Sequence, residues 1–313
     1  MPKLKREVSV IDDISVLIKV IRIIKENKID IIHCHSSKAG LIGSLAAWLM
    51  RVPVRVFTVH GWSSYGNTRR LAKSLYNILE KLTAGISTHI TCVSEADREY
   101  ALKYRLASQR KLYTIHNGSL PVEAEPYLRN ELHIEHNKTI IGTVARLSPQ
   151  KNPLFTIDVY AKLLIDDSNL LFVWVGDGPL MNECMERIKK VGIEDKFILL
   201  GNRDDANNLV GDFDIFSLLS EWESLPISII EAMVLGVPVI ASDVGGVGEL
   251  IQDGKNGVLV GNKDIAEIRN KIINLIKNSE LRYHYGKYSK IIAKKKFNQD
   301  KMIDKYKKIY TNG

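Results

Sequence analysis

The chain has 313 residues, of which 45% are hydrophobic and 26% are charged, and its formal net charge is +8. This length favours two domains. The composition is that of an ordinary soluble globular protein without heptad runs or short repeats, which excludes fibres, coiled coils and solenoids. Three cysteines with no CxxC pair argue against a zinc site or a disulfide scaffold.

The charge is unevenly distributed along the chain. Residues 1–120 carry 19 Lys and Arg against 9 Asp and Glu, residues 121–281 carry 15 against 25, and residues 282–313 carry 10 against 2. The basic segments fit three interpretations: nucleic acid, an anionic membrane surface or phosphorylated lipid, or a solvated face with no partner. No zinc finger, RNA-recognition signature or aromatic-studded basic loop accompanies them, so we expect no nucleic-acid partner.

The start of the chain carries no secretion or membrane-spanning signal. Its basic residues are not followed by an apolar segment of the kind that signal peptides have. The longest apolar run near the start, residues 39–50, is too short to span a bilayer. We therefore expect a cytoplasmic protein, with peripheral association at the inner face of the cytoplasmic membrane.

Predicted strands alternate with predicted helices along the first 120 residues, which is typical of parallel α/β sheets. The turn residues Asn117-Gly118 follow the last of these strands and predict a domain boundary near residue 120. Strands are expected at residues 30–35, 54–60, 89–93 and 111–116, with helices at 38–50, 69–82 and 94–104.

A second alternating series follows residues 122–137, an acidic stretch without clear periodicity that we expect to be a linker. We therefore predict two Rossmann-like, doubly wound α/β domains at 1–120 and 121–281, with the active site in the cleft between them. A basic C-terminal helix at 282–313 is expected to pack back toward the first domain. The predicted strands of the second series are 139–146, 170–175, 196–200, 214–219, 237–241 and 257–260, and the helices are 153–164, 179–191, 204–210, 226–235, 247–252 and 264–310.

Two glutamates are the strongest local signal. Glu223 lies in the loop after a predicted strand, and Glu231 lies eight positions later in the next helix. Leu225 and Pro226 stand at the start of that helix, where free N–H groups and the helix dipole favour an anion. Carboxylates on either side of such an anion suit sugar hydroxyls. The spacing alone leaves open a surface Glu and a helix Glu without function.

Arg146 and Lys151 form a second candidate pair. Arg146 ends the first strand of the second domain, and Lys151 follows five residues later. A guanidinium and an ammonium at the mouth of a sheet suit a diphosphate, which needs charge neutralisation as it leaves. The alternative is that both side chains are solvated near a helix start.

With these motifs the sequence resembles glycosyltransferase family 4, whose members have the GT-B fold and retain the anomeric configuration of the transferred sugar. The block from Glu223 to Pro238 resembles the family's E-x7-E motif, and the likeness runs in order over residues 4–310. Other segments resemble the Arg…Lys diphosphate clamp (142–153), the glycine turn with Gly176 and Gly178 (175–179), the loop under the donor (242–246), the first-domain histidine (59–62) and the hinge (115–118).

The resemblance implies a role for each matching residue. Glu231 is expected to bind the ribose hydroxyls of the nucleotide, together with contacts at Gly176 and Gly178. Glu223 is expected to contact hydroxyls of the transferred sugar, and His60 to reach toward that sugar from the first domain. His60 could instead be a strand-end histidine satisfied by the backbone. For His33 and His35, packing or acceptor contacts are favoured over a metal site.

The resemblance implies transfer of a hexose or N-acetylhexosamine from a nucleotide diphosphate sugar, with UDP as the expected nucleotide. The expected acceptor is a glycan or a polyprenyl-diphosphate-linked sugar, as in capsule, exopolysaccharide or O-antigen synthesis. An anionic membrane surface is a further expected partner. We expect no metal, because Arg146 and Lys151 already supply positive charge to the diphosphate and no DxD-type pair is present in a comparable loop. No cofactor is expected, since the nucleotide diphosphate sugar is a substrate. Two alternatives remain: a GT-B subunit that binds nucleotide without catalysis or only with a partner, and a sugar-nucleotide epimerase of the same fold.

The first domain departs from the family pattern. The chain begins at a segment, residues 4–12, that such proteins normally carry well inside their first domain, and fewer strands are predicted than a full first domain contains. We therefore expect an incomplete acceptor domain with an exposed sheet edge, and weak transfer by the chain as written.

Overall fold

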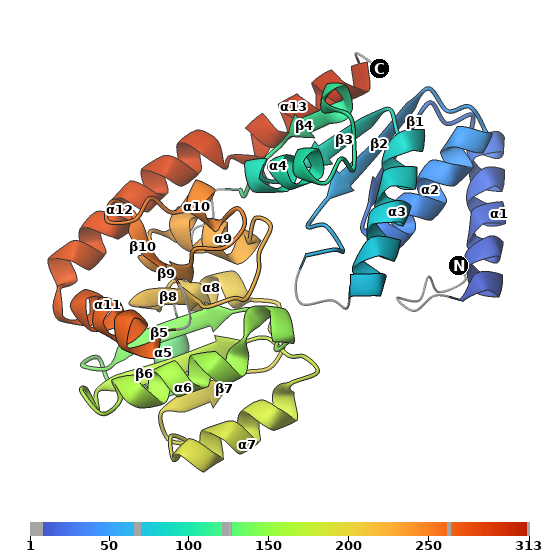
Figure 1. Ribbon diagram of the computed structural model, residues 1–313. Helices are drawn as coiled ribbons and strands as arrows, with labels where there is room; N and C mark the ends of the chain where they lie inside the picture. Colours follow the sequence, from blue (N-terminus) through green and yellow to red (C-terminus); the bar gives the residue numbers. More distant parts are fainter. Residues whose placement is uncertain (1–8, 66–69, 121–124, 126, 262–263, 312–313) are drawn as a thin grey trace. The chain divides into compact units, whose positions relative to one another are not determined.

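The computed structural model describes residues 9–65, 70–120, 125, 127–261 and 264–311. The chain divides into two compact units, shown in Figure 1. Unit 1 comprises residues 1–117 and 300–313, and unit 2 comprises residues 118–299. The division at 117/118 lies beside the Asn117-Gly118 turn.

Unit 1 contains a four-stranded parallel sheet in the order β1-β2-β3-β4. All four strands predicted for this part of the chain are present. Helices α1, α2 and α3 lie side by side in Figure 1, in agreement with their mutual contacts. The strands are β1 (Ile31–His35), β2 (Val54–Val59), β3 (His89–Cys92) and β4 (Leu112–Thr114); the helices are α1 (Val10–Asn27), α2 (Ser37–Leu49), α3 (Arg70–Ile86), α4 (Glu95–Lys103), the 3-10 turn η1 (Gln109–Lys111) and α13 (Gln299–Thr311).

Helix α1 was not among the predicted elements. It is amphipathic: Leu17, Val20, Ile21 and Ile24 recur at helical spacing and pack in one cluster with Ala46 and Ala47 of α2. Helix α4 is capped at its start, because the Ser94 side chain accepts a hydrogen bond from the Asp97 backbone N–H at 3.0 Å.

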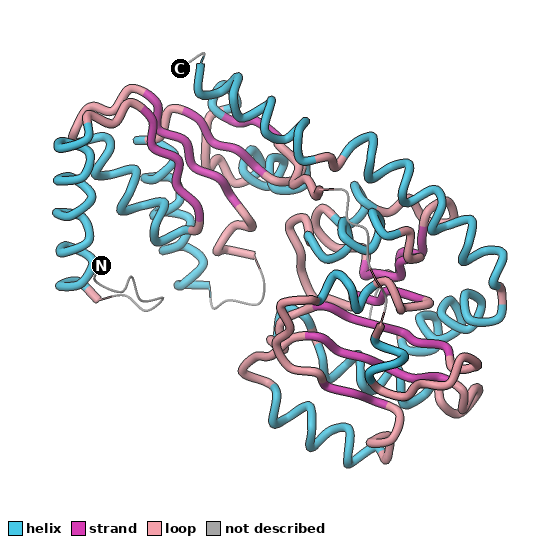
Figure 2. Tube along the Cα trace, turned by 180° about the vertical axis from the view of Figure 1, so that it is seen from behind, coloured by secondary structure: helices cyan, strands magenta, loops and turns pink. Residues whose placement is uncertain are grey.

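Unit 2 contains a six-stranded parallel sheet in the order β10-β9-β8-β5-β6-β7. Strands are drawn in magenta in Figure 2. The chain starts at the central strand β5, moves outward to β7, then returns to β8 beside β5 and moves outward the other way. This is the doubly wound Rossmann order. The strands are β5 (Thr139–Val144), β6 (Leu170–Val175), β7 (Phe197–Leu199), β8 (Ile215–Leu218), β9 (Val239–Ser242) and β10 (Gly257–Val260).

Two helical groups surround this sheet. Right-handed crossovers place the connections of the two halves on opposite faces. Accordingly, α6 contacts α7 and α11, while α9 contacts α8 and α12. The core between the layers contains Tyr160, Phe172 and Trp174, all essentially inaccessible to solvent. The helices are α5 (Leu128–Glu131), the 3-10 turn η2 (Pro149–Lys151), α6 (Pro153–Leu163), α7 (Met181–Val191), α8 (Ala206–Val210), α9 (Ile227–Leu235), α10 (Val247–Leu250), α11 (Ile265–Lys277) and α12 (Ser279–Lys296).

The stretch expected to be a linker, residues 122–137, contains a packed helix. Leu128 of α5 is fully buried, and its backbone N–H donates to Asp212 Oδ2 at 2.7 Å. Arg129 forms an ion pair with Asp214 at 2.8 Å. Among the described residues of this stretch only Leu128 is buried, and its few apolar residues form no extended periodic pattern, so local patterning did not predict this packing. Residues 121–124 and 126 lie outside the described residues.

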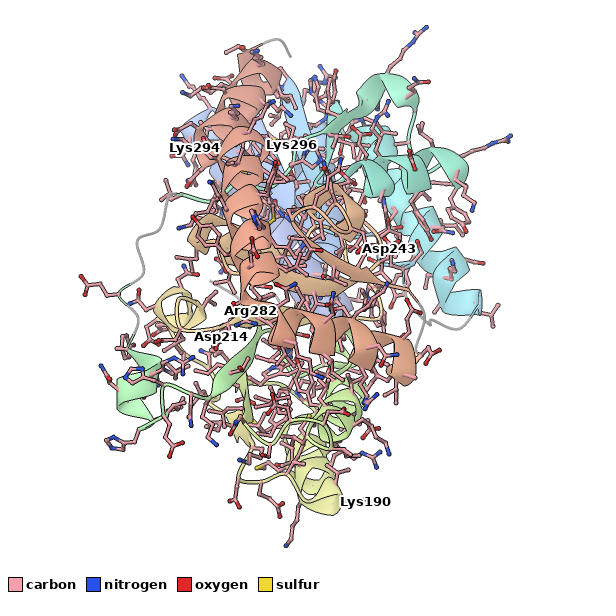
Figure 3. The ribbon with its side chains drawn as sticks, turned by 90° about the vertical axis from the view of Figure 1, so that its left-hand side faces the viewer. Lys190, Asp214, Asp243, Arg282, Lys294 and Lys296 are labelled. Atoms are coloured by element: carbon pink, nitrogen blue, oxygen red, sulfur yellow. The ribbon has the colours of Figure 1, made fainter. Side chains whose placement is uncertain are left out.

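The basic C-terminal segment is not one helix. The predicted helix 264–310 is three helices, with breaks at Asn278 and at Phe297-Asn298. Asn278 caps α12 by accepting from the Leu281 N–H at 2.9 Å, and Phe297 is buried. The expected helix 282–313 is therefore divided between the units. Its first part is the end of α12, which belongs to unit 2 and finishes in basic residues that include Lys294 and Lys296 (Figure 3). Its second part is α13, which packs Ile309 onto the sheet of unit 1.

The two connections between the units run alongside each other. The Ser119 N–H donates to the Phe297 carbonyl at 2.9 Å, and the Gln299 N–H donates to the Ser119 carbonyl at 3.3 Å. A Cβ at Gly118 would lie 2.6 Å from the Asn298 carbonyl oxygen, so this approach requires glycine. The glycine of the predicted hinge is thus explained by a close approach between two backbone segments.

Candidate active site

The candidate site lies where the strand order of unit 2 reverses, between β5 and β8. The loops after these two adjacent strands turn away from each other, and ligands of doubly wound sheets bind there. Arg146 and Lys151 follow β5, and Glu223 follows β8. The predicted donor-binding residues of the two loops therefore belong to one edge of the sheet.

Lys151 and Glu223 form a direct ion pair. The Lys151 Nζ to Glu223 Oε1 distance is 2.5 Å, and the two side chains are only 17% and 4% exposed. The Ser220 hydroxyl donates to the same oxygen at 2.6 Å, and Gln150 Nε2 lies 3.5 Å from Oε2. Sequence reasoning named Lys151 and Glu223 but missed both their pairing and the roles of Ser220 and Gln150. The only available signal was the three-residue spacing of Ser220 and Glu223.

A glycine loop supports the backbone beneath this pair. Gly245 has a φ of +52°, and a Cβ there would lie 1.8 Å from the Glu223 carbonyl oxygen. The Gly246 N–H donates to the Ser224 carbonyl at 2.9 Å. The loop that resembled the one under the donor therefore holds the Glu223 backbone in place.

Helix α9 begins at this edge, one residue later than predicted. Pro226 is its N-cap with an extended backbone, and the helix runs from Ile227. Leu225 and Pro226 are buried, so any contact they make with a ligand would come from the backbone. The N–H groups of a first helical turn have no partner within the helix, and they carry the positive end of its dipole. This arrangement suits an anion.

Glu231 differs sharply from Glu223. It lies in the middle of α9 and is half-buried. Within the described part of the chain, no hydrogen bond or ion pair to its carboxylate is present, and burial raises the pKa of this group. A desolvated carboxylate without a protein donor is well suited to accept hydrogen bonds from ligand hydroxyls. Ribose binding by Glu231 stays a prediction.

Gly176 and Gly178 allow two loops to join. Gly176 has a φ of +136°, and a Cβ there would lie 2.1 Å from the Ala145 carbonyl oxygen. A Cβ at Gly178 would lie 2.3 Å from the Leu147 carbonyl oxygen. The Leu147 N–H donates to the Asp177 carbonyl at 3.1 Å. The glycines thus fix the loop that carries Arg146, and nucleotide contact by them stays a prediction.

Arg146 lines a cavity of about 410 Å³ at the same edge, together with Gly176, Asp177 and Arg203. Arg203 is already paired with Glu131 and Asp205, each at 2.8 Å. The Arg146 side chain is exposed, and among the described residues it has no hydrogen-bond or ion-pair partner. It is therefore a cation available to a ligand.

His60 lies in unit 1, directly after β2. Its Nε2 is 3.0 Å from Nδ1 of His35, and the two rings are stacked with centroids 5.2 Å apart. Its partner is thus a side chain, whereas the alternative interpretation invoked the backbone. Burial lowers the pKa of both rings, and for His60 the neighbouring His35 lowers it further.

His33 extends the histidine cluster beneath α13. Its Nε2 lies 2.6 Å from Thr58 Oγ1, and its Nδ1 lies 2.6 Å from the Tyr310 hydroxyl. Burial first, then the two neighbouring histidines, lowers the pKa of His33 to about 4. The lowered pKa values favour the neutral form of each of the three rings. The described residues contain no group of three or more His, Cys, Asp or Glu side chains placed to hold a metal ion.

Two family models match successive parts of the chain. Residues 6–119 match the model described as Glycosyltransferase Family 4, and residues 125–291 match the model described as Glycosyl transferases group 1. No helix among the described residues is long and apolar enough to cross a membrane.

Similar proteins cover nearly all of the chain. The UDP-Gal:alpha-D-GlcNAc-diphosphoundecaprenol alpha-1,3-galactosyltransferase of Escherichia coli is 32% identical over 99% of this chain and 82% of its own length. The capsular polysaccharide biosynthesis glycosyltransferase CapM of Staphylococcus aureus is 24% identical over 98% of this chain and 83% of its own.

Among solved structures, Anabaena HepE in complex with UDP-glucose superimposes with a TM-score of 0.85 at 22% identity, covering 95% of this chain and 82% of that one. This likeness shows the fold alone. The predicted GT-B architecture is thereby confirmed, and the two family models together with the E. coli relative show that this chain belongs to the group 1 glycosyltransferases of glycosyltransferase family 4 and is a glycosyltransferase.

Proposed function

We propose that the enzyme transfers a hexose or N-acetylhexosamine from a UDP-linked donor, with retention, to a polyprenyl-diphosphate-linked or glycan acceptor in surface polysaccharide synthesis. Support for the donor and acceptor classes comes from the names of the relatives, one of which is named for a UDP-Gal donor and a GlcNAc-diphosphoundecaprenol acceptor. The names of other relatives refer to O-antigen and capsule synthesis.

The observation that carries the proposal is the pairing of buried Glu223 with Lys151 where the strand order reverses. Arg146, which lies in the loop after β5 at the same edge of the sheet, has no hydrogen-bond or ion-pair partner among the described residues. Glu223 is held in one orientation by Lys151 and Ser220, while Arg146 remains available to an anion. A departing nucleotide diphosphate develops negative charge, which Arg146 and the start of α9 would neutralise. A fixed carboxylate suits the hydroxyls of the sugar that carries the developing positive charge.

Retention follows in this proposal from placement of the acceptor on the same face as the leaving phosphate. The leaving phosphate then takes the acceptor proton, and the protein supplies orientation and charge stabilisation instead of a strong base. In unit 1, His60 orders the reacting face. The cations and the helix start replace a metal, so we propose transfer without a divalent ion or cofactor.

The test uses the purified chain with UDP-Gal, UDP-Glc and UDP-GlcNAc, each with and without a short-chain polyprenyl-diphosphate GlcNAc acceptor. We expect acceptor-dependent UDP release. Retention of the donor's α configuration is expected to give an equatorial anomeric proton in the product, which NMR detects as a small coupling between H1 and H2. A Glu223→Gln variant, whose kcat is expected to be strongly lowered, is the control. Epimerised donor without acceptor would indicate the epimerase alternative, and UDP binding without any turnover would indicate a non-catalytic subunit.

We further propose that unit 1 binds an anionic lipid surface at the inner face of the cytoplasmic membrane. Helix α3 exposes an apolar stripe at helical spacing, and Leu71 on it is 88% exposed. The basic excess of residues 1–120 is complementary to anionic headgroups. The stripe consists of Leu71, Leu75, Ile78 and Leu82, and α1 exposes Val10, Ile11, Ile14 and Ile18.

Sedimentation with vesicles tests this surface. We expect binding to vesicles of phosphatidylglycerol and phosphatidylcholine but not to phosphatidylcholine alone, and loss of binding in a Leu75→Ser, Ile78→Ser double variant. Ile165→Ser, at an exposed position of unit 2, is the matched control. Equal binding to both vesicles would contradict the proposal. So would self-association in solution that the double variant abolishes, because the stripe would then be an interface between copies.

A further inference from the structure

Ser220 is buried in the loop that follows β8, three residues before Glu223. The residue is only 4% exposed, and its hydroxyl donates a hydrogen bond to Glu223 Oε1 at 2.6 Å. Lys151 Nζ contacts the same oxygen at 2.5 Å. Two strong donors therefore converge on one carboxylate oxygen.

The other oxygen of Glu223 has far weaker support. Gln150 Nε2 lies 3.5 Å from Oε2, at the limit of hydrogen bonding, and the same Nε2 donates to the Trp222 carbonyl at 3.1 Å. An ionised carboxylate can accept about four hydrogen bonds, shared between its two oxygens. The acceptor capacity that remains for a ligand is thus concentrated on Oε2.

We propose that Ser220 is a positioning residue for sugar transfer. Together with Lys151 it pins Oε1, and this leaves Oε2 as the oxygen that accepts from a hydroxyl of the transferred sugar. Ser220 itself does not contact the sugar. The inference rests on the proposed function, because it requires Glu223 to face the sugar, and it adds a residue that the motif comparison did not include.

A purely structural role for Ser220 makes a different prediction. If its hydroxyl only satisfied a buried carboxylate, its loss would lower the melting temperature and leave turnover of the folded enzyme unchanged. If it orients Glu223, its loss lowers kcat through Glu223 and leaves UDP binding unchanged. The two roles are therefore separable by kinetics on the folded protein.

The experiment compares Ser220→Ala, Ser220→Thr, Glu223→Gln and the Ser220→Ala, Glu223→Gln double variant, with kcat, donor KM, UDP affinity and melting temperature measured for each. We expect Ser220→Ala to lower kcat roughly 10- to 100-fold, the range for a hydrogen bond to a charged group, with UDP affinity within twofold of the parent. Ser220→Thr keeps the hydroxyl and is expected to restore most of kcat. The double variant is expected to be no slower than Glu223→Gln alone.

Ser289→Ala is the matched control. Ser289 is a fully buried serine of α12 whose hydroxyl donates to the Asn256 carbonyl at 2.8 Å, so its loss is expected to lower stability and not kcat. Parental kcat in Ser220→Ala, or additive losses in the double variant, would overturn the inference. If Glu223→Gln itself kept parental kcat, the proposed function of Glu223 would fail, and this outcome is distinct from failure of Ser220 alone.

Discussion

Two groups of polar side chains are held together in different ways: the Glu223 cluster of unit 2, made of Glu223, Lys151 and Ser220, and the histidine cluster of unit 1, made of His33, His35 and His60. Glu223 is buried and bound by a charged lysine and a buried hydroxyl, and the glycine loop at Gly245 packs against its backbone. His60 and its partner His35 are partly desolvated by their neighbours, but both residues remain accessible to solvent, and they are joined by a hydrogen bond between two imidazole rings whose pKa values are lowered. Charge-assisted bonds between buried groups are stronger than neutral bonds in contact with water.

The difference indicates two kinds of preorganisation. The carboxylate of unit 2 already has a fixed orientation without ligand, which is what stabilisation of a transition state requires. The histidines of unit 1 are joined to α13 through His33 and Tyr310, so their geometry depends on a helix that returns from the far end of the chain. We therefore expect substitutions in the Glu223 cluster to have the larger effects on turnover.

The largest effect is expected for Glu223→Gln. Loss of the fixed charge is expected to lower kcat by roughly 100- to 1000-fold, the range for removal of one preorganised electrostatic contact, while UDP affinity stays within a few-fold because UDP lacks the sugar. Glu231→Gln is the opposite case, with weaker UDP binding because ribose is present in UDP. Calorimetry and steady-state kinetics on both variants test the assignment, and the reverse pattern would exchange the two roles.

The next largest effect is expected for Arg146, which has no ion-pair partner in the part of the chain that the structure describes. Arg146→Ala is expected to weaken UDP binding by about 1.5–3 kcal/mol, the range for a hydrogen bond to a charged group. The control is Arg187→Ala, which removes an arginine paired with Asp158 elsewhere in unit 2. Isothermal calorimetry measures both. Unchanged affinity in Arg146→Ala would remove this residue from the diphosphate site.

A smaller effect is expected in unit 1. His60→Ala is expected to lower kcat about tenfold, the upper range for one neutral hydrogen bond, and to leave UDP affinity unchanged. His89→Ala is the control, because His89 lies at the amino-terminal end of β3, whereas His60 follows the carboxyl end of the neighbouring strand β2. A rate loss in His60→Ala as large as that of Glu223→Gln would contradict the comparison between the two clusters.

Glu231 predicts a pH-dependent stability difference. Burial raises its pKa in the folded state, so the folded state binds the proton more tightly than the unfolded chain, whose pKa is roughly 4.3. The stabilisation is complete below that value and is lost as pH rises through the raised pKa. Glu231→Gln is therefore expected to be more stable than the parent at neutral pH, with the difference vanishing at low pH. Melting temperatures across pH test this, and a gain that grows toward low pH would contradict it.

No effect is expected from removal of divalent metal. Transfer in EDTA is expected to equal transfer in magnesium or manganese, because Arg146 and the start of α9 supply the positive charge. Activity lost in EDTA and restored by either ion would show that these groups are insufficient.

Much of the fold was predictable because it depends on local patterns. Alternating apolar strands and helices predicted all ten strands of the two sheets, and the register of Arg146, Lys151, Glu223 and Glu231 against a family motif predicted the enzyme class. These features depend on residue type and spacing, which the amino-acid sequence contains directly. Helix α1 was not predicted, although its apolar residues repeat at helical spacing.

Contacts between distant residues were decided only by the tertiary structure. Lys151 and Glu223 are 72 positions apart, and His33 and Tyr310 are 277 apart, so no local pattern could pair them. The division of the basic C-terminal segment between the two units also depends on where Phe297 is buried. Burial and pairing are properties of the packed chain, because the strength of a charge or hydrogen bond depends on the neighbours that exclude water from it.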